Sequence, residues 1–255
     1  GHMAADSSKN IFLRLAQHEW YRSVDRRLDM ARRIVENKVQ NQIALIRSFR
    51  WNQDEYDHKN DLREMERVLK SLKEKETSNE IMGVEGICSA IYFRAYGHMF
   101  RCKIEFHGRN RRPPKDPINV MLSLTYTFLT KEVAAVLEAE SFETYLGFLH
   151  GIRYGRKSLA LDLVEEFRQP VADRLVLRLF NKQMMSEYDF DLEEERVLLR
   201  EKSFQKFCVE YEKWMTQPVS EADGRSFREI LKEQISKLKK AVREQKEYVP
   251  YSWRR

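Results

Sequence analysis

Residues 116–139, DPINVMLSLTYTFLTKEVAAVLEA, decide the fold class. Asp116-Pro117 supplies an N-cap followed by a proline in the first turn, which is a common way for a helix to begin. From Ile118 to about Ala139, apolar side chains occupy most faces of the helix that follows. A helix of that kind belongs in a protein interior. We therefore predict an all-α protein whose central buried helix spans about 118–139.

Other helices are predicted on the N-terminal side of this stretch. Between residues 23 and 49, apolar residues recur at helical spacing and polar residues fill the opposite face. Residues 51–76 are dense in charge and carry a thinner apolar stripe, so a more exposed helix is expected there. Thr77 and Glu80 have the spacing of a capping box, and they open a third helix that Gly97 can close.

The C-terminal side is predicted to be helical as well. Glycine (9 residues) and proline (6 residues) are too scarce for the frequent turns of an all-β fold, and nothing in the pattern requires a β-sheet. The acidic run 186–195 is typical of a solvated linker or a helix start. The expected elements are a short helical piece at 141–149, a helix capped by Ser158 that Pro170 restarts and that runs to about Met185, helices at 194–215 (with Val197, Leu198, Phe204, Phe207 and Tyr211 inward) and 226–247, and a basic aromatic tail at 248–255.

Positive charge is concentrated in two predicted loops. The whole chain carries 46 basic and 40 acidic residues, and this net charge of +6 does not by itself establish nucleic-acid binding. Residues 101–115 hold six basic residues against one acidic residue, and residues 153–157 form a second basic loop. Such loops suit a phosphodiester backbone. The side chains expected to bind DNA are Arg109, Arg111, Arg112, Lys115, Arg153, Tyr154, Arg156 and Lys157.

The number and spacing of the cysteines and the hydropathy of the chain indicate its cellular compartment. Cys88, Cys102 and Cys208 are odd in number and lack CxxC spacing, so neither a zinc cage nor a disulfide framework is expected, and a reducing cytoplasm fits better. No signal peptide is recognisable, and no uncharged apolar run reaches the ~18 residues that a membrane span needs. We therefore expect a cytoplasmic protein without a membrane segment.

Glu85 lies where an apolar residue is expected. Ile81 is four residues before it and Cys88 three residues after it, so its carboxylate lies on the apolar stripe of the helix. An unpaired buried carboxylate costs at least several kcal/mol, so Glu85 needs a cation or a proton. Its partner is either a metal ion or an arginine, with Arg94 or Arg101 as the donor.

The helix around Glu85 also has an unusual composition. Gly83 and Gly86 flank the carboxylate, and each lowers helix propensity by ~1 kcal/mol relative to alanine. We interpret this weakness as a sign that another backbone or a ligand approaches the helix closely.

Two further groups are candidates for the same site. His150 follows Gly-Phe-Leu and precedes a glycine, so it is expected at a helix end among apolar residues, where a satisfied structural histidine is the alternative to a metal ligand. Asp162 and Glu165 are three residues apart, which places both carboxylates on one face of their helix. The alternative for this pair is a solvent-exposed face, which Glu166 and Arg168 also favour.

These groups together indicate a particular chemistry. Carboxylates and one imidazole from separate helices form a mixed oxygen and nitrogen set that suits Mg²⁺ or Mn²⁺, whereas softer metals would be expected to recruit the cysteines. A hard divalent cation beside bound phosphates is the arrangement for in-line attack by water or by a 3′-hydroxyl. The residues therefore point to metal-dependent cutting and joining of DNA.

Three runs around these residues resemble a known family. They are GVEGICSAIYF (83–93), RPPKDPINVMLSLTYTFL (112–129) and GFLHGIRYGRKSLALDLVEEFRQPVADRLVL (147–177). In order and separation they are similar to the motifs of the CRISPR adaptation integrase, CRISPR-associated protein one. A weaker likeness extends to LRLAQ (13–17), ARRIVENKVQNQ (31–42) and YVPYSWR (248–254), so that nearly the whole chain is covered.

The resemblance implies roles for single residues. It makes Glu85, His150 and Glu165 the ligands of a Mg²⁺ or Mn²⁺ ion, and it matches Asp162 to an acidic position associated with activity. It implies cleavage of DNA and transesterification, in which the 3′-hydroxyl of an incoming fragment attacks a phosphodiester at the boundary of a CRISPR repeat. Two further residues within the motifs, expected to support the site or to contact DNA, are Asn119 and Tyr126.

The resemblance also implies partners and a domain organisation. Members of the family form homodimers and assemble with the small CRISPR-associated protein two, and a small β-rich domain precedes their helical part. Here the helical part begins almost at once, after Gly1-His2-Met3, which has the composition of a cloning remnant. We interpret 1–7 as tag scar and leader, 8–76 as linker helices of the catalytic domain, and 77–255 as the helical catalytic core with a basic tail, in one domain overall.

Two other functions stay open at this point. The chain is alternatively a non-catalytic helical module that holds DNA or a protein partner, which predicts salt-sensitive binding without dependence on a metal. Otherwise it is an integrase relative from a mobile element, with the same chemistry in a different host context.

Overall fold

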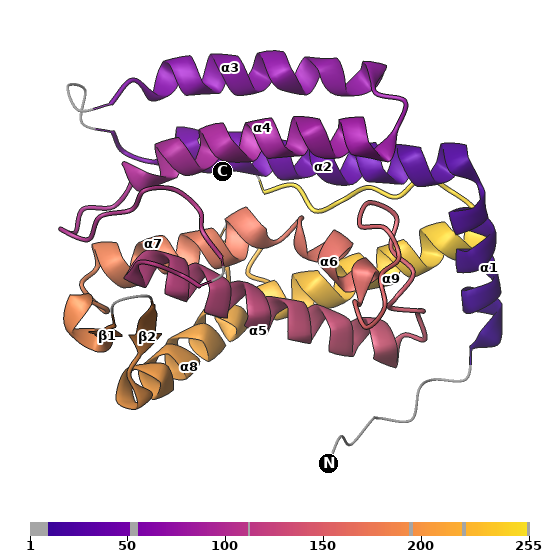
Figure 1. Ribbon diagram of the computed structural model, residues 1–255. Coiled ribbons are helices and arrows are strands. Elements are labelled where there is room, and N and C mark those ends of the chain that lie inside the picture. Colours follow the sequence, from indigo (N-terminus) through magenta and orange to yellow (C-terminus); the bar gives the residue numbers. More distant parts are fainter. Residues whose placement is uncertain (1–9, 52–55, 112, 194–195, 221–222, 254–255) are drawn as a thin grey trace.

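The computed structural model describes residues 10–51, 56–111, 113–193, 196–220 and 223–253, so the leader predicted at 1–7 lies outside the described residues. Helices dominate these ranges, as predicted (Figure 1). In chain order the elements are α1 (Ile11–Arg22), α2 (Val24–Ser48), α3 (His58–Lys70), η1 (Ser71–Glu74), α4 (Ser78–Gly97), α5 (Pro117–Ala139), α6 (Ser158–Val164), η2 (Arg168–Asp173), α7 (Arg174–Asn181), η3 (Glu187–Asp189), β1 (Phe190–Leu192), β2 (Val197–Leu199), α8 (Glu201–Thr216) and α9 (Phe227–Glu244).

The helix α5 lies at the centre of the fold, and its prediction is confirmed. The side chain of Asp116 caps it by accepting a hydrogen bond of 2.7 Å from the backbone N–H of Asn119. Side chains such as Leu122 and Leu129 are fully buried, and the helix contacts α6, η2, α7, α9 and β2. With a mean hydropathy of 1.4, α5 also has the length and composition of a membrane span. Its place in the core accounts for that composition.

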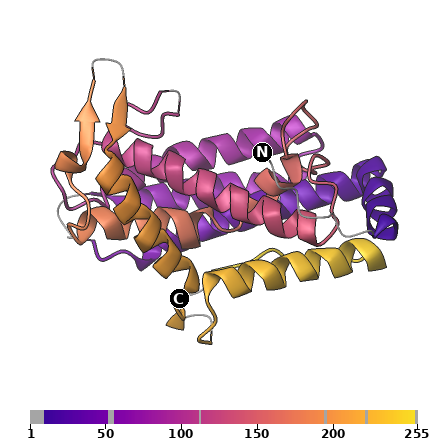
Figure 2. The ribbon, with the colours of Figure 1, turned by 90° about the horizontal axis from the view of Figure 1, so that it is seen from below.

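The helices α2 and α4 form a layer over α5 and η2, and α3 packs on the outer side of that layer (Figures 1 and 2). The capping box that opens α4 is confirmed: Thr77 Oγ1 accepts from the Glu80 N–H at 3.3 Å, and Glu80 Oε2 accepts from the Thr77 N–H at 3.0 Å. Gly97 ends α4, also as predicted. Lys38 on α2 and Glu85 on α4 therefore lie on adjacent helices.

The helix predicted at 141–149 is wrong, because this segment is a series of turns. Ser141 has a φ of 74°, which no regular right-handed helix allows. The side chain of Gln17 on α1 takes over the hydrogen bonds that a helix would have made. Its Nε2 donates to the carbonyls of Glu143 (3.0 Å) and Leu146 (3.1 Å), and its Oε1 accepts from the Glu143 N–H. A distant side chain thus replaces the helical ladder.

The helix predicted at 194–215 is also partly wrong. Residues 194–195 lie outside the described residues, and β1 and β2 form an antiparallel hairpin before α8 begins at Glu201. Val197 is buried and Leu198 is 40% exposed, which is the alternation of a strand. Phe207 and Tyr211 point inward as expected, whereas Phe204 is 39% exposed.

The segment from Ser158 to Met185 is less regular than predicted. Ser158 does not cap α6, because its hydroxyl donates to the carbonyl of Gly151 at 3.1 Å. Pro170 lies within η2, a π-helical turn between α6 and α7. Proline lacks an N–H and cannot continue an α-helical ladder, so the wider turn accommodates it. The last helix of the segment, α7, ends at Asn181.

The C-terminal tail is anchored in the core. Asn41 on α2 donates to the carbonyl of Tyr251 (3.2 Å) and accepts from the N–H of Trp253 (3.0 Å). The buried carboxyl group of Glu166 accepts from the Tyr248 hydroxyl and from the Tyr251 N–H, both at 2.8 Å. The tail therefore packs against Glu166, which directly follows the site candidate Glu165 in the sequence.

Replacing Glu166 by glutamine is expected to remove a pH-dependent loss of stability. Burial raises the pKa of Glu166 to about 8, although the hydrogen bonds from the tail lower it. Because this pKa lies above that of an unfolded glutamate, the stabilisation is full below about pH 4 and is lost as the pH rises through about 8. Urea denaturation at about pH 5, 7 and 9 gives the free energy of unfolding of each protein. The value for Glu166→Gln, relative to that of the wild type, should rise by a few kcal/mol between the lowest and the highest pH. A difference that does not vary with pH would contradict the assignment.

Candidate functional site

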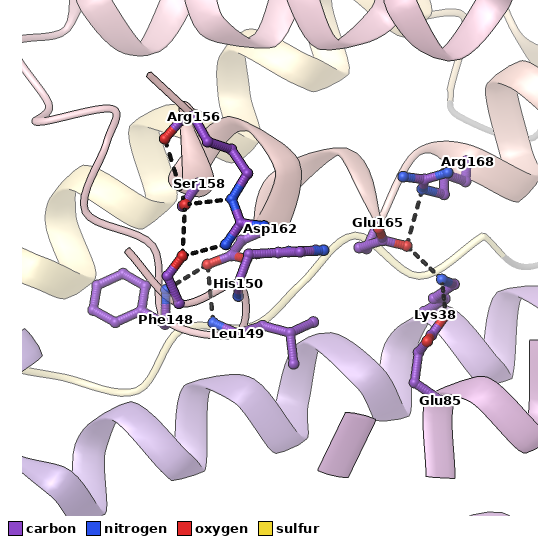
Figure 3. Close-up of polar contacts among 11 residues, drawn as sticks. Lys38, Glu85, Phe148, Leu149, His150, Arg156, Ser158, Asp162, Glu165 and Arg168 are labelled. Atoms are coloured by element: carbon purple, nitrogen blue, oxygen red, sulfur yellow. Dashed lines mark hydrogen bonds and ion pairs between the residues drawn. The ribbon is translucent and has the colours of Figure 1, made fainter. Parts of the chain in front are cut away.

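Glu85 and Glu165 meet on one buried lysine. Lys38 Nζ forms an ion pair with Glu85 Oε1 and lies 2.7 Å from Glu165 Oε2 (Figure 3). The three residues come from α2, from α4 and from the end of α6. Carboxylates 80 positions apart in sequence are therefore held by a single positive charge.

Burial makes this arrangement costly unless the charges balance. The side chain of Lys38 is 7% exposed and that of Glu165 is 4% exposed. Burial alone would raise the pKa of Glu165, but Arg168 and Lys38 lower it to about 2. Burial also opposes ionisation of Glu85, and Lys38 again leaves its pKa below the ordinary value. Both carboxylates are thus ionised at neutral pH, and two cations face them.

The cation that pairs with Glu85 is a lysine, and not the arginine that the sequence offered as the alternative to a metal ion. Arg94 pairs with Asp61 on α3 instead, so the alternative of a buried Glu85–Arg94 pair is wrong, and Arg101 makes no ion pair with Glu85 in the described structure. Of the two approaches inferred from Gly83 and Gly86, that of another backbone is wrong for the described residues, because a Cβ atom at either position would meet open space, whereas the approach of a ligand stays a prediction.

Sequence reasoning missed Lys38, although a signal was present. Lys38 is four residues after Ile34 and three residues after Val35, and both of these are buried. This places the lysine on the apolar stripe of α2, as Glu85 is placed on that of α4. Two opposite charges on the apolar stripes of two helices are a reason to expect a buried ion pair.

His150 is held in place by Asp162. The imidazole Nδ1 lies 2.7 Å from Asp162 Oδ1, and the same carboxylate accepts the backbone N–H groups of Phe148, Leu149 (3.0 Å) and His150 (2.9 Å). A Cβ atom at Gly147 would lie 2.7 Å from Ser158, so only glycine fits beside this turn. His150 therefore lies in a turn wrapped around a fully buried carboxylate, not at a helix end.

The His150 ring contacts Asp162 through Nδ1, which leaves the second ring nitrogen, Nε2, for another partner. A carboxylate beside Nδ1 keeps the proton on that nitrogen, so Nε2 is the acceptor in the neutral ring. His150 is directed toward Glu165 (Figure 3), close enough for its charge to affect that carboxyl group. Asp162 uses both oxygens on the turn, so its geometry is that of a residue that positions His150.

The solvent-exposed alternative for the face of Asp162 and Glu165 is wrong. Asp162, Glu165 and Glu166 are all buried. Arg168 lies 3.0 Å from Glu165 Oε2, and its guanidinium group stacks 4.3 Å from the ring centre of Tyr126. Tyr126 thereby supports Arg168, the cation that faces Glu165. The sequence predicts that Tyr126 supports the site or contacts DNA.

The predicted metal ligands are not gathered into one cluster. Within the described ranges, no three His, Cys, Asp or Glu side chains are close enough together to hold one metal ion. Lys38 instead lies between Glu85 and Glu165. Glu165 Oε2 lies 2.7 Å from Lys38 Nζ and 3.0 Å from Arg168 Nε, so two cations of the chain face this buried oxygen. A metal ion that binds Glu165 would therefore compete with Lys38 for it.

The two predicted DNA-binding loops lie at opposite ends of α5. Residues 101–115 precede its first turn, and residues 153–157 follow its last turn and the turns after it. The helix has 23 residues, so its ends are roughly 35 Å apart at 1.5 Å per residue. The loops thus flank the site rather than surround it, which suits an extended ligand.

The basic side chains of these loops differ in their exposure. In the first loop, Arg109 is half-buried and donates to Asn119 Oδ1 (2.7 Å) and to Ser123 (2.9 Å), so Asn119 holds this loop. Arg111 and Lys115 are exposed, and Arg112 lies outside the described residues. In the second loop the exposed side chains are Arg153 and Tyr154, whereas Arg156 donates to Gly151 and Lys157 pairs with Glu138.

Comparison with known proteins identifies the family. The model of the family described as "CRISPR associated protein Cas1" matches residues 1–213. CRISPR-associated endonuclease Cas1 3 of Thermus thermophilus is 35% identical over an alignment 254 residues long, which covers 97% of this chain and 73% of that protein. The chain belongs to the Cas1 family. The family resemblance seen in the sequence is therefore confirmed.

Other Cas1 relatives are longer than this chain. CRISPR-associated endonuclease Cas1 1 of Chlorobaculum tepidum is 36% identical, and the match covers 72% of this chain and 56% of the relative. The corresponding protein of Moorella thermoacetica is 37% identical, with 72% and 55% covered. The chain thus spans little more than half the length of these two relatives.

Solved structures share the fold of the Cas1 chain. A Cas1 protein from Thermotoga maritima superimposes with a TM-score of 0.84 at 28% identity, covering 99% of this chain and 77% of that one. A structure described as a casposase bound to integration product gives a TM-score of 0.85 at 25% identity, with 99% and 72% covered. The all-α architecture is therefore that of solved Cas1 structures.

Proposed function

We propose that this chain is the catalytic part of a divalent-metal-dependent DNA endonuclease and integrase of CRISPR spacer acquisition. In that reaction a phosphodiester is cut, and the 3′-hydroxyl of a DNA fragment is joined to the repeat array by transesterification. The observation that carries the proposal is the convergence of Glu85 and Glu165 on one buried cation, with the imidazole of His150 directed toward them.

The comparisons support this reading of the site. Relatives above 30% identity are named CRISPR-associated endonucleases, and the casposase relative is described as bound to an integration product. A Cas1 family chain whose acidic residues converge in this way is expected to retain the family chemistry. The CRISPR names of the sequence relatives favour spacer acquisition over an integrase of a mobile element.

The residues present fit a hard divalent metal. Glu85 and Glu165 supply carboxylate oxygens that share the cation of Lys38, and His150 supplies Nε2. This is the donor set that Mg²⁺ or Mn²⁺ accepts. When bound, such an ion would neutralise charge that develops on a phosphodiester and favour formation of the attacking oxyanion.

The surrounding residues hold these donors in place. Asp162 fixes the His150 ring through Nδ1, so that Nε2 faces Glu165. Arg168, stacked on Tyr126, keeps Glu165 ionised. Lys38 occupies the space between the carboxylates and neutralises them when no other cation is bound. Ion binding therefore requires the Lys38 ammonium group to withdraw, and a nearby DNA phosphate is a suitable new partner for it.

Replacing Lys38 by methionine is expected to strengthen metal binding. The substitution keeps the apolar stem of the side chain and removes the ammonium group that competes for the two carboxylates. The carboxylates then repel each other, so the metal-free variant should unfold at lower temperature and bind Mn²⁺ about tenfold more tightly. Electron paramagnetic resonance of free Mn²⁺ during a titration gives the affinity of each protein.

The exposed Lys182 supplies the matched control for this titration, because Lys182→Met removes the same charge away from the site. Its Mn²⁺ affinity should equal that of the wild type. Saturable binding that is lost in Glu165→Ala supports the proposed function. Absence of saturable binding by the wild type and by Lys38→Met alike would contradict the metal site.

The proposal includes three partners. DNA is the substrate, a second copy of the chain forms a homodimer, and the small protein Cas2 completes the assembly. A solved Cas6-RT-Cas1–Cas2 complex shares the fold at 22% identity. A complete integration reaction is therefore expected to need both protein partners, whereas cleavage requires only the site described above.

A further inference from the structure

A cavity of about 450 Å³ lies at the far end of α2 and α4, away from Lys38. Four aromatic rings line it, those of Phe49, Trp51, Tyr56 and Phe100. Phe49 directly follows α2, eleven residues after Lys38, which corresponds to roughly 16 Å along the helix. The cavity is thus separate from the candidate metal site but lies on the same helical layer.

The aromatic rings of this cavity are held rigidly. The indole N–H of Trp51 donates to the carbonyl of Ile46 at 2.9 Å, and its ring stacks on His58 with centroids 4.6 Å apart. The hydroxyl of Tyr56 donates to Asp61, and its ring stacks on His98 at 3.9 Å. Rings that are already fixed lose little conformational entropy when a flat ligand stacks on them.

Two arginine side chains are among the described residues that line the cavity. Arg50 and Arg101 line it, and in the described structure neither of them forms an ion pair with a carboxylate. The guanidinium group of Arg101 lies 5.6 Å from the ring centre of Phe49. The carboxylate of Asp61, which accepts a hydrogen bond from Tyr56, is paired with Arg94. Burial and Asp61 raise the pKa of Tyr56 to about 12, so its phenol carries no negative charge at neutral pH.

We propose that this cavity binds an unpaired nucleotide of a DNA strand, with the base stacked on the aromatic rings and a flanking phosphate held by Arg50 and Arg101. The inference rests on the proposed function in that it takes DNA as the ligand. Aromatic faces combined with unpaired arginines are the means by which proteins hold single strands without reading their sequence. A cavity of this volume accommodates a group of nucleotide size.

The position of the cavity agrees with a strand that also reaches the metal site. Arg101 begins the basic loop 101–115, so positive charge continues from the cavity along the surface. At 3.4 Å per stacked nucleotide, the distance along α2 to Lys38 corresponds to roughly five nucleotides. The cavity is therefore assigned to the unpaired arm of a branched substrate whose cleavage point lies near Glu85 and Glu165.

Photochemical cross-linking tests this assignment on the wild-type chain. The probe is a forked DNA with 5-iodouracil at single positions along its unpaired arm, irradiated without divalent metal and mapped by mass spectrometry. Cross-links to peptides that contain Trp51 or Tyr56, from a position about five nucleotides from the junction, support the assignment. Cross-links confined to other peptides, such as one that contains Tyr154, overturn it.

Binding measurements give a second readout. By fluorescence anisotropy, Trp51→Leu should bind the forked DNA about tenfold more weakly and blunt duplex unchanged. The Arg50→Ala/Arg101→Ala variant leaves the rings in place, and it should reduce the slope of log affinity against log salt by about 0.7, the value for one lost phosphate contact. The control Lys240→Ala/Arg243→Ala removes the same charge from α9 and should change neither value.

The outcomes separate this inference from the proposed function. If the wild type binds forked DNA and both cavity variants bind it equally well, the cavity assignment fails while the proposed function stands. If dAMP at millimolar concentration abolishes the cross-links without displacing the DNA, the cavity binds free nucleotides and the assignment to a strand is overturned. If the wild type binds no forked DNA at all, both the assignment and the proposed DNA substrate are wrong.

Discussion

Replacing His150 by alanine is expected to lower Mn²⁺-dependent cleavage of single-stranded or branched DNA at least about a hundredfold, with the fold intact. The side chain is 22% exposed and lies on a turn, and its polar contact within the described structure is with Asp162. Its removal therefore leaves three backbone N–H groups still bound to that carboxylate. What is lost is the imidazole nitrogen that is directed toward Glu165.

The matched control for this experiment is His18→Ala, an exposed histidine on α1. Circular dichroism and thermal unfolding of both variants establish that the fold is retained. Glu85→Ala is expected to abolish cleavage in the same way. Cleavage at the wild-type rate by both His150→Ala and Glu85→Ala would sink the assignment of the site. DNA binding that depends on salt and not on metal, without any cleavage by the wild type, would instead favour the non-catalytic module.

Replacing Asp162 by alanine is expected to have the largest effect on stability, a loss of about 3–5 kcal/mol. The carboxylate is fully buried and accepts three backbone N–H groups together with the His150 ring. Alanine leaves those donors buried without an acceptor, and each such donor costs about 1–3 kcal/mol. Because the turn also positions His150, cleavage should be lost along with stability.

Urea denaturation measures this loss, and hydrogen exchange locates it. The amides of Phe148, Leu149 and His150 should lose protection in Asp162→Ala, whereas amides of α5 should change only with global stability. Asp162→Asn retains one acceptor oxygen and should fall between the alanine variant and the wild type. Asp191→Ala, which removes an exposed carboxylate paired with Arg200, should cost less than about 1 kcal/mol. An equal cost for the two alanine variants would show that Asp162 does not organise the turn.

Much of the helical fold was predictable because its signals are local. The N-cap Asp116, the capping box of Thr77 with Glu80, and the apolar periodicity of α2 and α5 all act within a few residues. Predictions failed where distant groups intervened. Gln17 satisfies the backbone of the turns after α5, and Pro170 lies in a π-helical turn that is stabilised by its surroundings.

The site was predictable only in part, and for the same reason. Helical spacing identified Glu85 as a buried charge, but the identity of its partner depends on how α2 packs against α4. The packing of α6 and η2 against α5 and α2 buries Glu165, for which the charge pattern left a solvent-exposed face as the alternative. Asp162 was expected beside Glu165 as a second acidic group, whereas its oxygens are taken by the turn that holds His150.

The sequence by itself determined the fold class, the central helix at about 118–139, the anomalous burial of Glu85 and the family motifs around His150 and Glu165. These depend on periodicity, capping and the cost of burying charge, which are properties of short stretches of chain. Only the tertiary structure decided that Lys38 joins Glu85 to Glu165 and that aromatic rings form a basic cavity at the end of the same layer. Such contacts depend on which helix faces lie together, because neutralisation of a buried charge requires a partner within a few ångströms, however far away it is in sequence.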